Sequence, residues 1–394
     1  MKKILLCLLV LPVLAHAAVD IDKRAAQLAK KYPLVDTHID VPHRINQHWE
    51  DVTAATREGQ FDYPRAVAGG LNIPFMSIYT PASSELDGTA YAQANILIDQ
   101  VEAIVQRAPD KFALVHSSTE AITQFKAGKI ALVLGMENGA PIAGDLDKLR
   151  HFHSRGVRYI TLAHSLSNHI SDSSYDDVAL WQGLSPFGLE LVEAMNELGV
   201  MIDISHLSDE AALEVLAASR APVIASHSSA RYFVPEFERN MNDEIVKLLA
   251  ANGGVIMINF GSSFLTVQAN DYSNTFRTAA TAFAEQRKLA KGSPEVLAFD
   301  QAYRSKHPYP FASVADVANH IDHVVKLVGI NHVGIGSDFD GVGDSLPVGL
   351  KDVSQYPNLI AELLRRDYRE RDIAKILGGN LLRVWQQVER GVEL

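Results

Sequence analysis

The sequence predicts a (β/α)8 barrel of the TIM type, because short apolar runs alternate along it with amphipathic stretches of helical periodicity. The apolar runs have the length and composition of buried parallel strands. They are residues 34–40, 71–79, 130–137, 158–164, 199–205, 222–227, 254–259 and 332–338. Most of them end in an ionisable side chain. Since the carboxyl ends of barrel strands meet at one face, this second pattern also favours a barrel.

The stretches between the runs carry helix signals. Residues 91–107 and 187–198 place apolar side chains three and four positions apart. Ser208 precedes a helix with two acidic residues in its first turn, which is typical of an N-cap. Residues 243–251 end at Asn-Gly-Gly, a helix stop that leads into the next strand. Residues 372–389 complete the chain as helix.

One segment interrupts the alternation. Residues 264–311 separate the seventh strand from the last helix and strand by far more than an ordinary connection. Within it, residues 276–291 have a helical pattern, whereas residues 306–310 are typical of an irregular loop. We expect an insertion over one end of the barrel, within a single barrel domain that spans residues 18–394.

The first residues have the pattern of a secretory signal peptide, residues 1–17. Lys2 and Lys3 form a positive start, residues 4–14 are apolar, and Ala15-His16-Ala17 fits a cleavage site. The apolar run is much shorter than the ~20 residues needed to cross a bilayer. We therefore expect an exported protein, periplasmic or secreted, with no stable membrane anchor.

Composition excludes several kinds of chemistry. The only cysteine, Cys7, lies in the predicted signal peptide, so the mature chain would have no disulfide, thiolate ligand or cysteine nucleophile. Any metal must then be bound by His, Asp and Glu. The formal net charge is −11 and no basic cluster stands out, so nucleic acid is not an expected partner.

The residues at the strand ends form the candidate site. His38 and Asp40 lie two positions apart on one strand, so both side chains point to the same side and can share a metal ion. The other strand-end residues are Glu137, His164, His206, His227 and Asp338. So many buried ionisable groups are costly unless they are paired or bound to metal. Glu137 could bridge two ions through its two oxygens.

These residues carry a resemblance to a known family. The ordered series is Asp-Thr-His-Ile-Asp40, Met-Glu-Asn-Gly139, Tyr-Ile-Thr-Leu-Ala-His164, Ile-Asp-Ile-Ser-His206, Ser-His-Ser-Ser-Ala230, Arg239-Asn240 and Gly-Ser-Asp-Phe-Asp-Gly341. It resembles the membrane (renal-type) dipeptidase family, peptidase family M19 of the amidohydrolase superfamily, over about residues 34–380. The resemblance implies a homodimeric dipeptidase whose substrates include dipeptides with a D-residue at the C-terminal position.

The resemblance also implies the role of each residue. His38 and Asp40 would bind one zinc ion, His206 and His227 the second, and Glu137 would bridge the two. The residues matching the family's substrate-facing positions are His164, Arg239 and Asp338.

The expected chemistry is attack on the peptide carbonyl by a hydroxide held between the two zinc ions. His164 would stabilise the oxyanion, and Asp338 would carry a proton from the attacking water to the leaving amine. Arg239 would bind a substrate carboxylate or assist at the oxyanion.

Other polar residues have simpler interpretations. His320 and His323 favour a packing or solvated role, Asp340 a loop or capping role, and His332 the face opposite the site. His169 could line the pocket. Asp36 and Asp203 precede the expected ligands, and we expect them to orient the imidazoles.

The chain departs from the family beside the expected pocket. Gly261 follows Asn259-Phe260 where many relatives have an aromatic residue, and residues 165–169 differ from the usual pattern. Side-chain preference therefore stays open. Two other functions also stay open. One is an amidohydrolase-type enzyme that cleaves amides, lactones or β-lactams at the same site. The other is a non-catalytic metal- or peptide-binding protein.

Overall fold

The computed structural model describes residues 10–290 and 292–391, with side chains from residue 20 onward. Its centre is a parallel sheet in the order β1-β2-β4-β5-β6-β7-β8-β9, with β3 beside β4. The strands are β1 Val35–Ile39, β2 Ile73–Tyr79, β3 Phe112–Leu114, β4 Ile130–Glu137, β5 Val157–Thr161, β6 Met201–Asp203, β7 Ile224–Ser228, β8 Val255–Ile258 and β9 Val333–Ile335. Each of the eight predicted runs overlaps one of these strands, although β5 begins one residue before its run and β7 ends one residue after its run.

The sheet closes between its first and last strands. The backbone N–H of Asp40 donates to Phe339 O at 2.9 Å, and that of Asp338 donates to His38 O at 3.1 Å. Residues at the ends of β1 and β9 therefore make the closing contacts. The result is the predicted TIM-type barrel, and candidate site residues from distant parts of the chain become neighbours in it.

Strand β3 was not predicted. Its three residues pair with the beginning of β4, where Phe112 lies opposite Ile130 and Leu114 opposite Leu132. It lies off the path of the barrel. A run this short has no periodicity of its own, so its sequence reads as part of a connection between two helices.

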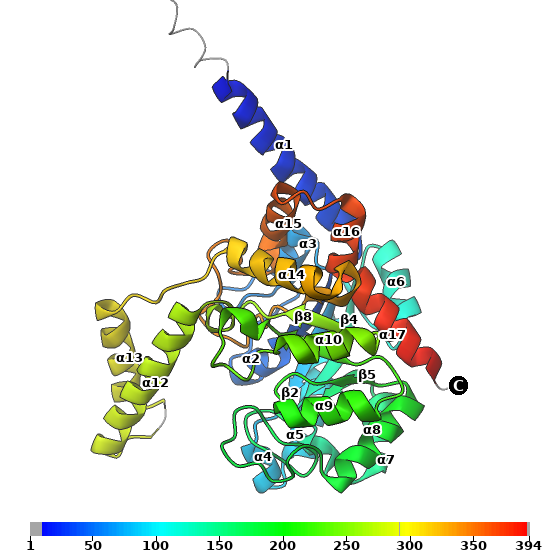
Figure 1. The fold of residues 1–394 in the computed structure, drawn as a ribbon, viewed down its shortest axis with the longest axis vertical. Helices are drawn as coiled ribbons and strands as arrows, with labels where there is room; N and C mark the ends of the chain where they lie inside the picture. The colour runs from blue at the N-terminus through cyan, green and yellow to red at the C-terminus, as the bar shows by residue number, and fades with distance from the viewer. Residues whose placement is uncertain (1–9, 291, 392–394) are drawn as a thin grey trace, which may run out of the picture.

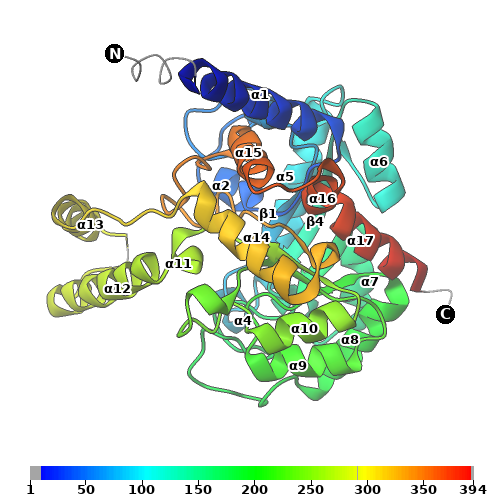
Figure 2. The same ribbon diagram turned by 45° about the horizontal axis from the view of Figure 1, so that its top comes forward.

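Helices surround the barrel, as Figures 1 and 2 show. They are α1 Val10–Lys31, α2 Val41–Gln47, α3 Tyr63–Gly69, α4 Ser83–Leu86, α5 Ala90–Arg107, α6 Ser118–Lys126, α7 Leu146–Ser154, α8 Pro186–Leu198, α9 Asp209–Ala218, α10 Asp243–Ala251, α14 Val314–Val328, α15 Tyr356–Arg365, α16 Glu370–Ala374 and α17 Asn380–Arg390. A π-helical turn, Lys375–Gly379, joins the last two.

Local signals set several helix boundaries. Ser208 caps α9 by accepting a hydrogen bond from the backbone N–H of Ala211, as its position predicted. Helix α10 has the predicted bounds and is capped by Asn242. Helix α8 begins with Pro186 and ends at Gly199, which has φ 76°. A positive φ is tolerated best by glycine, so this residue allows the helix to stop directly before β6.

Part of the barrel interior is filled by large, mainly apolar side chains. Phe75 lies between the Tyr159 ring, 5.6 Å away, and the Trp385 ring of α17, 5.5 Å away. All three side chains are fully buried. Gly135 makes room for Tyr159, because a Cβ at this position would lie 2.1 Å from the Tyr159 Cζ atom. Tyr159 can therefore reach across the barrel toward the carboxyl ends of the strands.

Two helices stand away from the barrel as an arm (Figures 1 and 2). After the short helix α11, Ser262–Leu265, the arm consists of α12, Val267–Arg287, and α13, Pro294–Lys306. It lies within residues 264–311, the segment assigned above to an insertion. The helix predicted at 276–291 in fact begins at Val267 and ends at Arg287. Thr266 caps it by accepting from the N–H of Ala269. The first turns of this helix are largely polar, so they lack the spaced apolar residues from which a helix is predicted.

The predicted signal peptide, with Cys7, lies largely outside the described residues. The later part of α1 packs on α15 and forms ion pairs with α15 and α16. Arg365 contacts Asp22 at 2.8 Å, and Lys31 contacts Glu370 at 2.6 Å. In the described part of the chain, no helix has the length and apolar composition needed to cross a membrane.

Candidate active site

The seven strand-end residues named above meet at the carboxyl-terminal mouth of the barrel. Five of them line a cavity of about 390 Å³: Asp40, Glu137, His164, His206 and Asp338. His38 and His227 lie against the same cluster and are almost completely buried. Barrel closure thus brings together side chains that stand up to 300 positions apart in the sequence.

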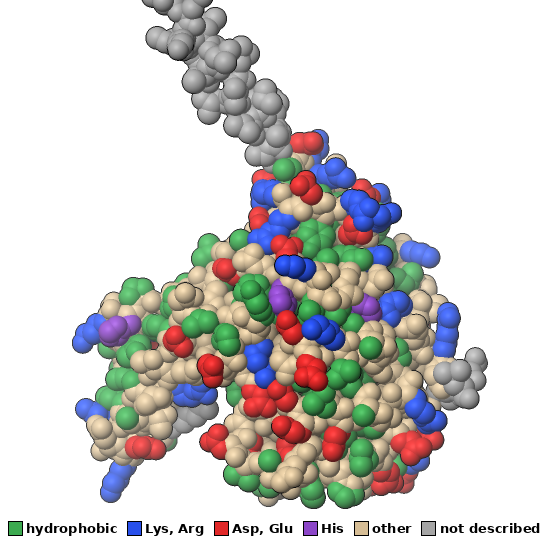
Figure 3. All heavy atoms as spheres, in the orientation of Figure 1, with side chains coloured by type: hydrophobic (Ala, Val, Ile, Leu, Met, Phe, Trp, Pro, Cys, Tyr) green, Lys and Arg blue, Asp and Glu red, His purple; other side chains and the backbone are tan. Residues whose placement is uncertain are grey.

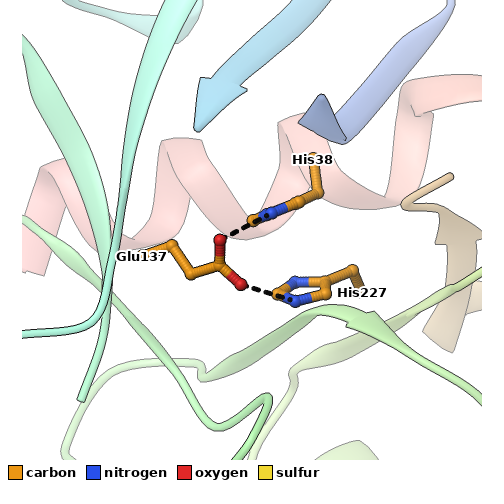
Figure 4. Close-up of side chains that lie close together, drawn as sticks. All are labelled: His38, Glu137 and His227. Atoms are coloured by element: carbon orange, nitrogen blue, oxygen red, sulfur yellow. Dashed lines mark ion pairs between the residues drawn. The ribbon is translucent and has the colours of Figure 1, made fainter. Parts of the chain in front are cut away.

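Glu137 lies at the centre of this cluster. Its Oε2 is 3.3 Å from His38 Nε2 and accepts a hydrogen bond of 3.2 Å from Ser77. Its Oε1 lies 3.1 Å from His206 Nε2 and 3.3 Å from His227 Nε2. Figure 4 shows the carboxylate between the His38 and His227 rings, one oxygen toward each. The two oxygens therefore face two different groups of ligand atoms.

The His38 imidazole is held by a tyrosine in the barrel interior. His38 Nδ1 lies 2.8 Å from Tyr159 Oη, and this hydroxyl donates to Thr37 O at 3.0 Å. Since the hydroxyl proton is used there, Nδ1–H must donate to Oη. In the neutral ring, Nε2 would then carry the lone pair that binds a metal. It is buried and has no hydrogen-bond partner among the described residues.

A second chain of hydrogen bonds holds His227. Ser226 Oγ donates to Asp203 Oδ2 at 2.6 Å and lies 2.7 Å from His227 Nδ1. His227 Nδ1–H therefore donates to the serine, which leaves the Nε2 lone pair directed at the site. His206 Nε2 is 2.9 Å from this atom. Two imidazole nitrogens this close together are suited to binding the same metal ion, because two lone pairs facing each other would repel.

Charge and burial set the protonation of the cluster. Burial, together with the charge of Arg239 and neighbouring imidazoles, lowers the pKa of His206 and His227 well below the usual value, so both are neutral. Burial alone would raise the pKa of Glu137, but His38 and His164 hold it well below its usual range. Burial opposes a charge on His38, but Tyr159, Glu137 and Asp40 together raise its pKa well above the usual value. His38 must therefore release a proton to bind a metal, whereas His206, His227 and Glu137 already have the forms that ligate metals.

Asp338 has a different electrostatic environment. Burial raises its pKa to about 7, and the nearby carboxylates Asp40 and Glu137 act in the same direction. Asn259 Nδ2 donates to Asp338 Oδ2 at 2.7 Å. A carboxyl group with this pKa can both take up and release a proton near neutral pH.

Among the described residues, three groups of side chains have ligand atoms close enough to hold an ion. They are His38 with Glu137 and His227, Glu137 with His164 and His206, and His38 with Asp40 and Asp338, and within each group the ligand atoms lie within 4.8 Å of one another. All ligand atoms are imidazole nitrogens and carboxylate oxygens, which suits zinc. The buried, unpartnered Nε2 of His38 supports this fit. His164 and Asp338 lie as near the cluster as the residues expected to be ligands.

The backbone around Asp338 is unusual. Asp338 has φ 64° and His206 has φ 72°, in the left-handed region that side chains other than glycine rarely adopt. Gly341 packs against the site, since a Cβ there would lie 2.1 Å from Asp338 Oδ1 and 2.3 Å from Asp40 Oδ2. This loop has room only for glycine at position 341.

Arg239 is buried next to His227. Its Nη1 donates to Ser228 Oγ at 2.7 Å, and its Nη2 donates to His227 O at 2.9 Å. The guanidinium also lies over the Phe264 ring, 5.3 Å from its centre. Only Nε has no partner among the described residues. Arg239 therefore fixes the β7 end and supplies a positive charge.

The structure changes the roles predicted for two supporting carboxylates. Asp203 orients His227, but through Ser226 rather than directly. Asp36 does not contact an imidazole, because it accepts from the backbone N–H of His38 at 3.1 Å and of Ser337 at 2.9 Å. Asp36 was predicted to orient an imidazole, and this prediction was wrong, since Tyr159 fills that place.

The remaining polar predictions agree with the structure except for His169. Asp340 lies in the loop and pairs with Arg44 at 3.0 Å. His320 is buried in α14 between Ala230 N and Leu265 O, and His323 pairs with Asp243 at 2.7 Å. His169 pairs with Glu85 and lines a neighbouring cavity, not the cavity lined by Glu137.

Sequence reasoning missed several residues at the site. Tyr79 and Tyr175 line the cavity, and Tyr159, Ser226 and Asn259 hold the strand-end side chains. Tyr159 and Ser226 lie on strands with their side chains turned into the barrel. Because inward and outward residues alternate along a strand, this alternation was the signal that could have identified them. Nothing local indicated which of them would meet an imidazole.

Comparison with known proteins agrees with this geometry. Residues 22–393 match the family model described as membrane dipeptidase (peptidase family M19). The chain belongs to this family. The M19 chain is 34% identical to dipeptidase verJ of Clonostachys rogersoniana over 380 residues, which cover 93% of this chain and 87% of that protein. It is 32% identical to dipeptidase tcpJ of Claviceps purpurea, over 90% of this chain and 76% of the relative.

A solved structure has the same fold. The crystal structure of the probable dipeptidase PvdM from Pseudomonas aeruginosa aligns with a TM-score of 0.81 and 30% identity, covering 94% of this chain and 99% of that one. This member of the M19 family is accordingly a metal-dependent dipeptidase. Its substrates are dipeptides.

Proposed function

We propose that this M19 dipeptidase uses two zinc ions to hydrolyse L-L and L-D dipeptides. His38 and Asp40 would bind one ion, His206 and His227 the other, and Glu137 both. One observation carries the proposal: Glu137 places Oε2 3.3 Å from His38 Nε2 and Oε1 3.1 Å from His206 Nε2. When bound, a pair of zinc ions activates water at neutral pH and polarises the carbonyl.

Asp338 is the proposed proton carrier. Its pKa of about 7 suits a group that accepts a proton from water and returns it to the leaving amine. Asn259 fixes one carboxylate oxygen at 2.7 Å, which leaves the other for the proton. Both oxygens are thereby oriented before substrate binds.

His164 is the proposed oxyanion partner. Its Nε2 lies 3.3 Å from Glu137 Oε1, and its side chain is partly open to the cavity. A donor placed beside the reacting carbonyl stabilises the charge that develops on its oxygen. Arg239 would add its buried positive charge and its unpartnered Nε, either at that oxygen or at a substrate carboxylate.

A substrate panel tests this function. The zinc-loaded protein is assayed with L-Ala-L-Ala, L-Ala-D-Ala, N-acetyl amino acids, a lactone and a β-lactam, each with and without a chelator. We expect turnover of both dipeptides, loss of turnover with chelator, and recovery when zinc is added. Two bound zinc ions without dipeptide turnover would overturn the proposal, and turnover only of the other compounds would favour the related amidohydrolase-type activity.

We also propose that the protein is exported to the periplasm or secreted after removal of residues 1–17, and that it is a homodimer without a membrane anchor. The positive, apolar and small-residue pattern of residues 1–17 supports the first part. The dimer rests on family resemblance. Mass spectrometry of the mature N-terminus, with cell fractionation, tests export. Light scattering gives the oligomeric state, and a monomer would contradict the proposal.

A further inference from the structure

A second cavity adjoins the active site. It has a volume of about 500 Å³ and lies between α12 and the barrel loops, and Tyr175 lines both it and the catalytic cavity. Figure 3 shows the hollow between the projecting arm and the body of the molecule. We call this space the arm cavity. A group bound at the catalytic centre could extend into it past the Tyr175 ring.

One face of α12 supplies the polar wall of the arm cavity. Asn270, Asn274 and Arg277 are spaced four and three positions apart, so they lie on the same side of the helix. Ser273 lines the cavity beside them. This stripe runs outward from the barrel rim and ends at a positive charge.

Hydrogen bonds along this stripe hold Arg277 in place. Asn270 Nδ2 donates to Ser263 O at 3.1 Å, and Asn274 Nδ2 donates to Asn270 Oδ1 at 3.0 Å. Arg277 Nη2 then donates to Asn274 Oδ1. The guanidinium is therefore oriented through one nitrogen, which lowers the entropy lost when it binds a ligand.

The other donors of Arg277 are available. Within the described residues, Nε and Nη1 make no hydrogen bond and no carboxylate forms an ion pair with this side chain. The lining of the cavity contains Ser, Asn, Tyr and Phe besides Arg277, and no acidic residue. Arg277 is exposed to solvent at the outer end of this polar cavity, and an oriented guanidinium there can donate to a carboxylate.

The position of the arm cavity indicates which part of a substrate would reach it. Arg239, proposed above to meet a substrate carboxylate or the oxyanion, lies over the ring of Phe264, and the Tyr175 ring lies 5.9 Å from the His206 ring. A C-terminal residue whose carboxylate lies toward Arg239 would have its side chain beside Tyr175. Phe237, which lines the arm cavity, packs 5.3 Å from Phe264 of the catalytic cavity and completes the passage.

We propose that the arm cavity is a specificity subsite for an acidic side chain on the C-terminal residue of the dipeptide, with Arg277 as the residue that binds its carboxylate. This inference rests on the proposed function. It gives the arm a role in substrate selection and predicts a preference for dipeptides such as L-Ala-L-Glu over the uncharged isostere L-Ala-L-Gln.

The test compares kcat/KM for L-Ala-L-Glu and L-Ala-L-Gln, and separately for L-Glu-L-Ala and L-Gln-L-Ala, on the zinc-loaded full-length mature protein. In the unmodified enzyme the first ratio should exceed one. Arg277→Gln should reduce it about tenfold, the usual cost of one charged hydrogen-bonding pair. The ratio of kcat/KM for L-Glu-L-Ala to that for L-Gln-L-Ala should stay the same in this variant. Arg277→Glu should shift selectivity toward L-Ala-L-Lys.

Arg287→Gln is the matched control, because it removes the same charge from the same helix outside the cavity, where Arg287 stacks on Phe283 at 4.1 Å. An unchanged first ratio in Arg277→Gln, or an equal fall in Arg287→Gln, would overturn the inference. So would a change confined to the second pair, which would assign the cavity to the N-terminal residue. Failure to hydrolyse any of the four dipeptides would instead overturn the proposed function.

Discussion

The Tyr159 hydroxyl lies 2.8 Å from His38 Nδ1 and at the same time donates to Thr37 O. The contact between Tyr159 and His38 connects the apolar side chains inside the barrel with the candidate metal site. The tyrosine stands 121 positions from the histidine in the sequence, and its ring reaches His38 only because Gly135 leaves space beside it.

Removing that hydroxyl should weaken metal binding. In Tyr159→Phe the His38 ring loses the acceptor that fixes its tautomer and orientation, so we expect zinc affinity to fall about 10- to 100-fold. Competition titration against a chromophoric chelator measures this. Tyr63→Phe is the control, since the Tyr63 ring packs on Phe112 at 5.5 Å away from the site. Equal zinc affinity in Tyr159→Phe and the unmodified protein would contradict the role given to the tyrosine.

Asp338→Asn should separate catalysis from metal binding. The amide keeps the size of the side chain but cannot carry the proton, so we expect kcat to fall at least about 10²-fold while two zinc ions remain bound. Metal content by atomic emission and kcat from the same preparation provide the measurement. Loss of one zinc ion would instead make Asp338 a ligand, consistent with its grouping with His38 and Asp40.

Gly341→Ala should damage the active site with little effect on folding. The new Cβ would meet Asp338 Oδ1 at 2.1 Å and Asp40 Oδ2 at 2.3 Å, so both carboxylates must move. A displacement of about 1 Å at a catalytic group costs about 10² in kcat/KM. Gly343→Ala in the same loop is the control for backbone strain, because Gly343 has φ 58° and a Cβ there meets nothing within 4 Å. Similar kcat/KM in both variants would show that contact with the carboxylates is unimportant.

His320 should make stability depend on pH. Burial lowers its pKa to about 4, against about 6.5 in an unfolded chain. Because the folded state holds the neutral ring, the stabilisation is fully present above about pH 6.5 and is lost as the pH falls toward 4. The linked free energy is on the order of 3 kcal/mol.

Urea unfolding of the protein and of His320→Gln across this pH range measures the effect. The free energy lost by the substitution should shrink by about 3 kcal/mol between pH 7 and pH 4, since Gln does not titrate. His48→Gln, at an exposed position, should show no such change. A difference between His320→Gln and the unmodified protein that is constant with pH would rule out the linkage.

The sequence could predict the barrel because its signals are local. Eight apolar runs, the Ser208 cap and the bounds of α10 follow from residue order and side-chain periodicity alone. The same order placed His38, Asp40 and Glu137 at strand ends, and a parallel barrel brings all such ends to one face. The strand-end residues that meet in the cavity could therefore be predicted from the sequence, whereas their individual roles are proposals.

Other features depended on contacts between distant residues. β3 is a strand only because β4 lies beside it, and the polar first turns of α12 are helical only through the Thr266 cap and their place on the arm. The partners of the imidazoles, Tyr159 and Ser226, and the stripe of α12 that ends at Arg277 were also decided by the tertiary structure. Periodicity records which face of an element is buried, whereas a hydrogen bond between residues over 100 positions apart exists only once the barrel closes.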